Sequence, residues 1–308
     1  MLRVMDVFRL RFQEHGVDVH CPEVVQTLSE DALLDLVPQF DGWIAGDDMA
    51  TRKVFEAGRA GRLKALVKWG IGTDNIDFDA AKDFGIPVKN TPFQFGREVA
   101  DVAMGYITGL ARETFLIDRA VRAGGWPKPR GISLKDKKVG LVGYGDIGTN
   151  IAKRALAAEM NVVVYDPAVP VGVVGDGCEA KAWPQGLSEC DFIVLACALT
   201  PQNRHMLNAD TLSKAKPGVR VVNVARGPLI DEVALIEALQ SGKVYSAALD
   251  VMEVEPLPMK STLRSLDRCV FGSHNGSNTT EAVQAASERA INLLFEMLSI
   301  DKARAAIR

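Results

Sequence analysis

Three glycines and one aspartate have a spacing that indicates nucleotide chemistry. Gly143, Gly145 and Gly148 form a G-x-G-x-x-G pattern, and Asp166 follows eighteen residues after the last glycine. The first glycine permits a tight turn, the second lets the backbone approach a phosphate, and the third lets a helix pack on a strand. The helix start offers free N–H groups to phosphates, while the aspartate would bind a ribose diol and repel a 2′-phosphate. The pattern predicts a dinucleotide site that prefers NAD to NADP; the alternative is an ordinary glycine-rich turn.

Three further side chains follow apolar runs in the same half of the chain. They are Arg226, Glu255 and His274. A guanidinium matches a planar carboxylate, and an imidazole can transfer protons near neutral pH. For the arginine the alternative is a surface ion pair with Asp231 or Glu232, and for the glutamate it is a solvated turn. Ligands of α/β folds bind beyond the carboxyl ends of strands, which favours the catalytic interpretation.

The remaining histidines of the four have weaker settings. His15 ends a polar helical stretch, and His20 closes a short strand far from the glycines. His205 lies in a segment that is typical of a solvated loop or a helix start. His274 is therefore the candidate for proton transfer.

The elements that position these residues alternate between short apolar runs and helical segments. This alternation is typical of parallel sheets with helices on both faces. In the first part of the chain strands are expected at 17–20, 42–45, 63–69 and 86–89. In the second part they are expected at 138–142, 162–165, 192–197, 220–224, 246–249 and 269–272. Helices are expected at 98–112, 147–160 and 281–299, and a Gly- and Pro-rich break at 124–131.

The beginning of the chain departs from this alternation. Residues 1–16 have a helical pattern, with Val4, Phe8 and Phe12 on one stripe. The alternative is a strand at 2–5. The helical interpretation implies that the usual first strand is missing or shortened.

Composition restricts the class of protein. The chain has 308 residues, an apolar fraction of 47% and a net charge of −3, which suits a globular enzyme and argues against nucleic acid or an anionic membrane as partner. The five cysteines are scattered, without a C-x-x-C pair or a metal-ligand cluster, as in a cytoplasmic protein without disulfides. No apolar run is long enough for a membrane span, and the start lacks a signal-peptide pattern.

The order of these motifs resembles the D-isomer-specific 2-hydroxyacid dehydrogenases over nearly the whole chain. The resemblance is strongest in the glycerate-type branch, which includes phosphoglycerate dehydrogenases. The matching segments are 70–77, 85–92, 139–148 with Asp166, 223–227, 248–256 and 274–279. The resemblance implies an α/β fold with two doubly wound parallel-sheet domains. A Rossmann NAD-binding domain is expected over 93–279, and a flavodoxin-like substrate domain over 1–92 plus 280–308.

The resemblance also implies roles for individual residues. The catalytic residues would be Arg226, Glu255 and His274. The cofactor NAD would contact Gly143, Gly145, Asp146, Ile147, Gly148, Asp166, Thr200, Ala225, Asp250 and Gly276. The substrate would contact Gly70, Ile71, Gly72 and Arg226. No metal is expected.

The implied reaction transfers a hydride between NAD(H) and C2 of a small D-2-hydroxy acid or 2-keto acid. Arg226 would hold the carboxylate and polarise the C2 carbonyl, and His274 would donate the proton to the developing alkoxide. Glu255 would orient the imidazole and favour its protonated form. The alternative is a non-catalytic NAD(H)-sensing protein of the same superfamily, similar to its transcriptional corepressors.

Three departures from the family pattern concern the substrate. Ser273 replaces a common proline, residues 93–97 read Phe-Gln-Phe-Gly-Arg, and Trp69 stands where a small residue is common. A glycerate-like or a phosphoglycerate-like substrate fits the resemblance. Lys68 and Arg97 are candidates to meet a phosphate, although charged residues of this kind are usually only solvated.

The break at 124–131 resembles the arm through which members of the family form dimers. It contains the apolar Trp126 among prolines. A homodimer joined through the nucleotide-binding domains is therefore expected; the alternative is a plain interdomain loop.

Overall fold

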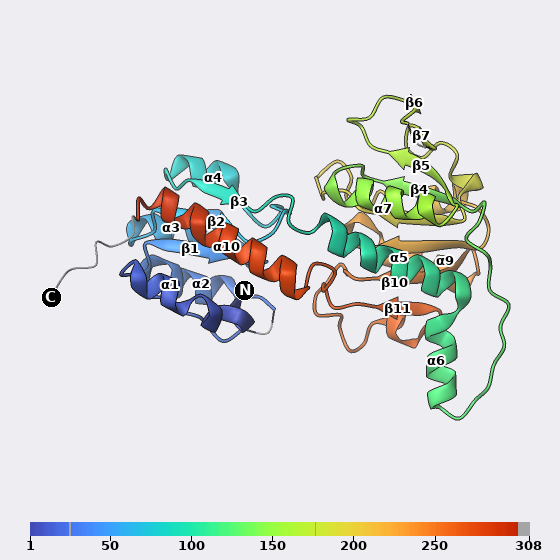
Figure 1. Ribbon diagram of the computed structural model, residues 1–308, viewed down its shortest axis with the longest axis horizontal. Coiled ribbons are helices and arrows are strands. Elements are labelled where there is room, and N and C mark those ends of the chain that lie inside the picture. Colours follow the sequence, from blue (N-terminus) through green and yellow to red (C-terminus); the bar gives the residue numbers. More distant parts are fainter. Residues whose placement is uncertain (25, 176, 301–308) are drawn as a thin grey trace. The chain divides into compact units, whose positions relative to one another are not determined.

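A computed structural model describes residues 1–24, 26–175 and 177–300 of the chain. It divides into two compact units, which Figure 1 shows as ribbons. Unit 1 consists of Met1–Gln94 and the chain from Asn278 onward, and unit 2 is Phe95–Ser277. Unit 2 is therefore inserted between the two parts of unit 1.

Unit 1 begins with helical structure, as predicted. A 3-10 helix, η1 (Leu2–Val7), is followed by α1 (Arg9–Glu14). Met5, Phe8 and Phe12 are buried in a cluster with Ile291 and Phe295. The alternative strand at 2–5 is wrong, because the apolar residues have helical spacing and all face this cluster.

The strand predicted at 17–20 is also wrong. These residues form no strand, although Val17 and Val19 pack against the cluster around Phe12. Alternating burial of an extended segment gives the same sequence pattern as a strand without requiring a partner strand.

The sheet of unit 1 has three parallel strands in the order β1-β2-β3 among the described residues. They are β1 (Gly42–Ala45), β2 (Ala65–Lys68) and β3 (Val88–Asn90). The helices are α2 (Glu30–Leu36), η2 (Val37–Gln39), α3 (Arg52–Ala60), α4 (Phe78–Asp83) and α10 (Thr280–Met297).

Strand β2 is buried on both faces. Leu66 packs into the cluster that contains Leu33 and Phe55. Its neighbours Ala65 and Val67 face the other way, against Ala290, Leu293 and Leu294 of α10. The C-terminal helix thus covers one face of a sheet made by the N-terminal part of the chain.

In the described part of unit 2, eight strands form one sheet in the order β11-β10-β9-β8-β4-β5-β7-β6. All pairs are parallel except that of β6 with β7. The strands are β4 (Lys138–Val142), β5 (Asn161–Tyr165), β6 (Gly172–Val173), β7 (Cys178–Ala180), β8 (Phe192–Leu195), β9 (Val219–Asn223), β10 (Val244–Leu249) and β11 (Cys269–Phe271). The strand order reverses at β4, between β5 and β8, which is the position where α/β sheets bind ligands.

Helices cover both faces of this sheet. They are α5 (Gly96–Arg112), α6 (Thr114–Arg122), α7 (Asp146–Ala157), α8 (Ala209–Lys214) and α9 (Glu232–Gln240), with short 3-10 turns η3 (Leu187–Glu189), η4 (Gly227–Leu229) and η5 (Thr262–Ser265). Helices α8 and α9 add Leu212 and Leu235 to the core on one face. Helices α5 and α7 pack side by side (Figure 1).

Helix α6 differs from its neighbours because none of its residues is buried. It projects from the body of unit 2 and leads into the extended segment that contains Trp126 (Figure 1). Among the described residues, no helix has both the length and the apolar character needed to cross a membrane.

Candidate active site

The glycine pattern lies at the turn between β4 and α7, at the point where the strand order reverses. Gly143 has a φ of +95°, and a Cβ there would lie 2.7 Å from the backbone of Cys197. A Cβ on Gly148 would overlap the carbonyl of Gly143, whereas a Cβ on Gly145 would meet no atom within 4 Å. Two glycines therefore close the turn and the third leaves open space beside the helix start. This arrangement fits a dinucleotide pyrophosphate.

Asp166 follows β5, the strand next to this turn. One carboxylate oxygen accepts a hydrogen bond from the backbone N–H of Tyr144, at 2.7 Å, and the other accepts one from the N–H of Ala168, at 2.8 Å. These bonds fix the carboxylate beside the turn between β4 and α7, which carries the glycine pattern. A carboxylate there suits a ribose diol and opposes a 2′-phosphate, which fits NAD.

The three candidate catalytic residues follow neighbouring strands. Asn223, Leu249 and Phe271 are paired across β9, β10 and β11 as the last residues of their strands. Arg226, Glu255 and His274 come a few residues later in each connection. The sheet register therefore places all three connections at one edge.

His274 and Glu255 form a hydrogen-bonded pair. Nδ1 of His274 lies 2.8 Å from Oε2 of Glu255, and both side chains are about three-quarters buried. The other oxygen of Glu255 accepts the N–H of Met252 at 3.0 Å. Glu255 is thus held from two sides, and it fixes the imidazole of His274 through Nδ1. The alternative of a solvated turn for Glu255 is wrong.

The backbone around His274 is constrained as well. His274 has a φ of 56°, a value that non-glycine residues rarely adopt. Its N–H donates to the carbonyl of Asp250 at 2.7 Å. The β10 connection therefore contacts both the main chain and the side chain of the histidine.

Arg226 is positioned by a buried amide. The Asn223 side chain donates to the carbonyl of Arg226 at 2.9 Å and accepts the N–H of Ala225 at 3.0 Å. Nη1 of Arg226 donates to the carbonyl of Ala225 at 2.8 Å. A Cβ on Gly227 would overlap the carbonyl of Met252, so the β9 and β10 connections are in backbone contact.

The two acids considered as partners of Arg226 have other bonds. Asp231 accepts the N–H groups of Val233 and Ala234 and caps α9. Glu232 accepts the N–H of Glu253 at 2.6 Å.

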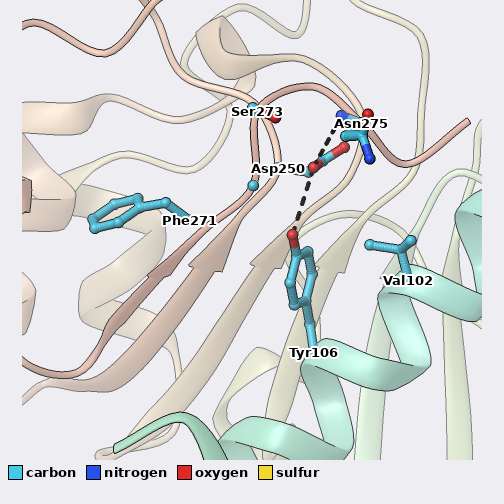
Figure 2. Close-up of a pocket in the computed structure, with 7 residues that line it drawn as sticks. Val102, Tyr106, Asp250, Phe271, Ser273 and Asn275 are labelled. Atoms are coloured by element: carbon cyan, nitrogen blue, oxygen red, sulfur yellow. Dashed lines mark hydrogen bonds between the residues drawn. The ribbon is translucent and has the colours of Figure 1, made fainter. Parts of the chain in front are cut away.

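Asp250 organises the segment that follows β11, and Figure 2 shows its carboxylate between Asn275 and Tyr106. It is 3% exposed. Its carboxylate accepts the N–H of Asn275 at 3.2 Å and that of Gly276 at 2.8 Å. The hydroxyl of Tyr106, from α5, lies 3.5 Å from the same carboxylate. Burial and the Asp250 carboxylate raise the pKa of the Tyr106 phenol, which therefore stays a neutral donor.

A pocket of about 310 Å³ adjoins this group. It is lined by Val102, Tyr106, Asp250, Phe271, Gly272, Ser273 and Asn275. The side chains of Val102 and Tyr106 extend from α5 and line the pocket opposite the ends of the strands (Figure 2). Ser273, which replaces a proline common in the family, therefore lines this pocket.

The predicted substrate loop lies in unit 1, after β2. Gly70 has a φ of +128°, and its carbonyl accepts the N–H of Thr91 at 3.1 Å. The carbonyl of Ile71 accepts the side-chain amide of Asn90 at 3.0 Å. In a trans peptide the N–H points opposite to the carbonyl, so the N–H groups of Ile71 and Gly72 point away from these partners. Two such N–H groups can bind a carboxylate edge.

Other predicted contacts occupy less distinctive settings. The N–H of Thr200 donates to the Asn203 side chain, Ile147 lies in the first turn of α7, and Ala225 and Gly276 are buried. Asp146 begins α7 and is considered below.

The side chains of Lys68 and Trp69 form an ion pair and hydrogen bonds with other residues of unit 1. Nζ of Lys68 lies 3.2 Å from Asp47 and 3.0 Å from the carbonyl of Trp69. The Trp69 indole donates to Ser287 of α10 at 3.2 Å. Among the described residues no group of three or more His, Cys, Asp or Glu could hold a metal ion.

The sequence did not indicate the role of Tyr106, nor the contacts of His205. His205 is half-buried, and its Nε2 lies 2.7 Å from Glu253, in the connection that carries Glu255. Glu253 and Glu232 each accept the N–H of the other. The apolar pattern of α5 gave no signal for a hydroxyl aimed at Asp250, because the two residues are 144 positions apart.

Comparison with known proteins agrees with this geometry. Residues 104–276 match the model of the D-isomer specific 2-hydroxyacid dehydrogenase NAD binding domain. The chain is 39% identical over 278 residues to a hydroxypyruvate reductase of Thermotoga maritima, covering 89% of this chain and 90% of that protein. It is 38% identical over 269 residues to a D-3-phosphoglycerate dehydrogenase of Methanocaldococcus jannaschii, covering 86% of this chain and 51% of that protein.

A solved structure shows the same architecture. The TT0316 protein of Thermus thermophilus superposes with a TM-score of 0.86 and 31% identity, over 96% of this chain and 94% of that one. The chain belongs to the D-isomer-specific 2-hydroxyacid dehydrogenases. It is an NAD-dependent dehydrogenase of the class that acts on CH–OH groups, and the predicted family, fold class and cofactor are confirmed.

Proposed function

We propose that this enzyme reduces a small, unphosphorylated 2-keto acid of the hydroxypyruvate type to the D-2-hydroxy acid. The observation that carries the proposal is the Glu255–His274 pair at the sheet edge that also bears Arg226. The hydroxypyruvate reductase named above supports the substrate class. Lys68 supports the absence of a phosphate, because its ammonium is beside the carboxylate of Asp47, which would repel a phosphate.

Each residue has a stated task in this reaction. Arg226 binds the substrate carboxylate and polarises the C2 carbonyl, and the N–H groups of Ile71 and Gly72 bind the other carboxylate edge. When bound, NADH supplies the hydride for C2. His274 donates a proton from Nε2 to the oxygen of C2, and Glu255 keeps the imidazole oriented and protonated. In the oxidative direction His274 accepts that proton.

The two units divide these tasks. Unit 2 binds NAD through Gly143, Gly145 and Gly148, with Asp166 on the ribose diol. Thr200, Ala225, Asp250 and Gly276 complete the proposed cofactor contacts. Unit 1 supplies the loop from Gly70 to Gly72.

The test is NADH oxidation with hydroxypyruvate, glyoxylate, pyruvate and phosphohydroxypyruvate. Hydroxypyruvate should have the highest kcat/KM. A preference for phosphohydroxypyruvate would contradict the substrate class.

His274→Ala should lower turnover by roughly 10²–10⁴, the usual loss for one positioned proton donor, and should leave the Kd for NADH nearly unchanged. Full activity of this variant, or no activity of the wild type on any 2-keto acid, would contradict the catalytic roles.

We also propose a homodimer that uses α6 and the segment after it. Helix α6 buries none of its residues, and Val121 and Trp126 are 40% and 79% exposed. Apolar groups exposed on a projecting helix favour a protein partner. Light scattering should give a dimer at micromolar protein, and Trp126→Ser should shift the mass toward the monomer. A monomeric wild type contradicts the proposal.

We propose a cytoplasmic location on the basis of the cysteines. The five cysteines are scattered along the chain, and three of them, Cys178, Cys190 and Cys269, are buried. Such thiols suit a reducing compartment. Cell fractionation with an antibody against the chain tests this, and recovery in an extracellular fraction would contradict it.

A further inference from the structure

An acidic residue begins α7, the helix whose first turn carries the glycine pattern. Asp146 is the first residue of α7, directly after Gly145. The N–H groups of this first turn are the ones that bind a pyrophosphate. A carboxylate on the same turn carries the same charge as that ligand, so its direction matters for binding.

The Asp146 carboxylate lies against α5. A Cβ built on Gly96 would overlap the carboxyl carbon and both carboxylate oxygens of Asp146. Gly96 is the first residue of α5, after Phe95, whose ring offers no acceptor to the helix start. The positive end of the α5 dipole favours a carboxylate at this place.

Further bonds join the two helices and steady this arrangement. Arg154 of α7 pairs with Asp101 of α5 at 2.6 Å. Asn150 donates to the carbonyl of Asp146 at 2.8 Å and approaches its carboxylate at 3.3 Å. The Arg154–Asp101 pair therefore joins α5 and α7, and the bonds of Asn150 hold Asp146 within α7.

We propose that Gly96 is a positioning residue for the cofactor. Its missing side chain gives the Asp146 carboxylate a place on α5, away from the phosphate-binding turn. Any larger residue at position 96 displaces the carboxylate into the open space beside Gly145, where a Cβ would meet no atom within 4 Å. This inference rests on the proposed cofactor site.

The direct test is Gly96→Ala, with Gly105→Ala as the matched control. Gly105 lies in the same helix, and a Cβ there would meet nothing within 4 Å. Both changes replace glycine by a better helix former, so thermal unfolding of the apoprotein should show neither variant below the wild type. Fluorescence titration should show a Kd for NADH raised about 4-fold in Gly96→Ala alone, the effect of a like charge about 5 Å from a phosphate in an aqueous surrounding.

Charge removal then separates the electrostatic role from a steric one. The double variant Gly96→Ala/Asp146→Asn should recover most of the NADH affinity that Gly96→Ala loses. High salt should reduce the difference in NADH affinity between Gly96→Ala and the wild type. Equal NADH affinity of Gly96→Ala and Gly105→Ala would overturn the inference, and so would a double variant as weak as Gly96→Ala. Failure of the wild type to bind NADH would overturn the proposed cofactor site together with the inference.

Discussion

Replacement of Asp250 tests whether this carboxylate holds the His274 segment or contacts the nicotinamide, as the family resemblance implies. In the structure both carboxylate oxygens accept backbone N–H groups, from Asn275 and Gly276. The Tyr106 hydroxyl lies beside them. The perturbations are Asp250→Ala, which removes every acceptor, and Asp250→Asn, which keeps one oxygen.

The expected loss of stability follows from burial. Gly276 is buried, so Asp250→Ala leaves its N–H without an acceptor, at about 1–3 kcal/mol. Asn275 is exposed, and water can replace the carboxylate at its N–H. The Tyr106 hydroxyl also loses its hydrogen bond. The two losses, at Gly276 and at Tyr106, together should lower the free energy of unfolding by about 2–5 kcal/mol. The Asp250→Asn variant should lose about 1 kcal/mol, because the amide oxygen can still accept from Gly276.

The assay is urea unfolding of the apoprotein, followed by turnover and NADH titration. Displacement of His274 by about 1 Å should lower turnover about 10²-fold. Tyr106→Phe should have a smaller effect in the same direction, since it removes a single long hydrogen bond.

The two roles of Asp250 predict different effects of Asp250→Ala on the stability of the apoprotein and on the Kd for NADH. A structural role predicts lower stability of the apoprotein in Asp250→Ala. A nicotinamide contact predicts an unchanged apoprotein and a raised Kd for NADH. Unchanged unfolding of Asp250→Ala would therefore refute the structural argument.

Three other outcomes follow from the site and the core. Glu255→Gln removes the carboxylate that favours the His274 imidazolium, so the basic limb of the reductive kcat/KM profile should move to lower pH; an unmoved limb in an active variant contradicts the pairing. Asp166→Ala should reduce the preference for NADH over NADPH roughly 10-fold, because the variant has no negative charge beside the 2′-phosphate of NADPH. An unchanged ratio of the two Kd values would mean that residues other than Asp166 determine the preference. Burial raises the pKa of the Cys269 thiol to about 12 from an ordinary 9.0. The unfolded chain therefore loses this proton first, and this thiol alone should lower the stability by about 1.4 kcal/mol per pH unit between these values. Urea unfolding should find the pH dependence of stability smaller by this amount in Cys269→Ala.

The sequence predicted the central strands of unit 2, β4, β5, β8, β9 and β10, because these are buried on both faces. A run such as 139–142 has no polar side chain and is followed by a glycine turn, which leaves few alternatives. The same reasoning failed at 17–20, where Val17 and Val19 are packed without a partner strand. The short antiparallel pair of β6 and β7 was not predicted, since two or three residues give no periodic signal.

The candidate site could be predicted where side chains follow strands directly. Position after a strand brought Arg226, Glu255 and His274 to one edge, because neighbouring parallel strands end together. Contacts across elements could not be predicted in this way. The pairs Tyr106–Asp250 and Gly96–Asp146 join helices to distant turns, and no spacing in the sequence relates them.

The insertion of unit 2 between the two parts of unit 1 affects the order of synthesis. Every strand of unit 2 has been made once residue 277 is translated. At that time Ala65 and Val67 have no cover on one face, because Leu293 and Leu294 of α10 are still to come. On the ribosome, unit 2 can therefore fold first, while the sheet of unit 1 exposes an apolar face that a chaperone can bind.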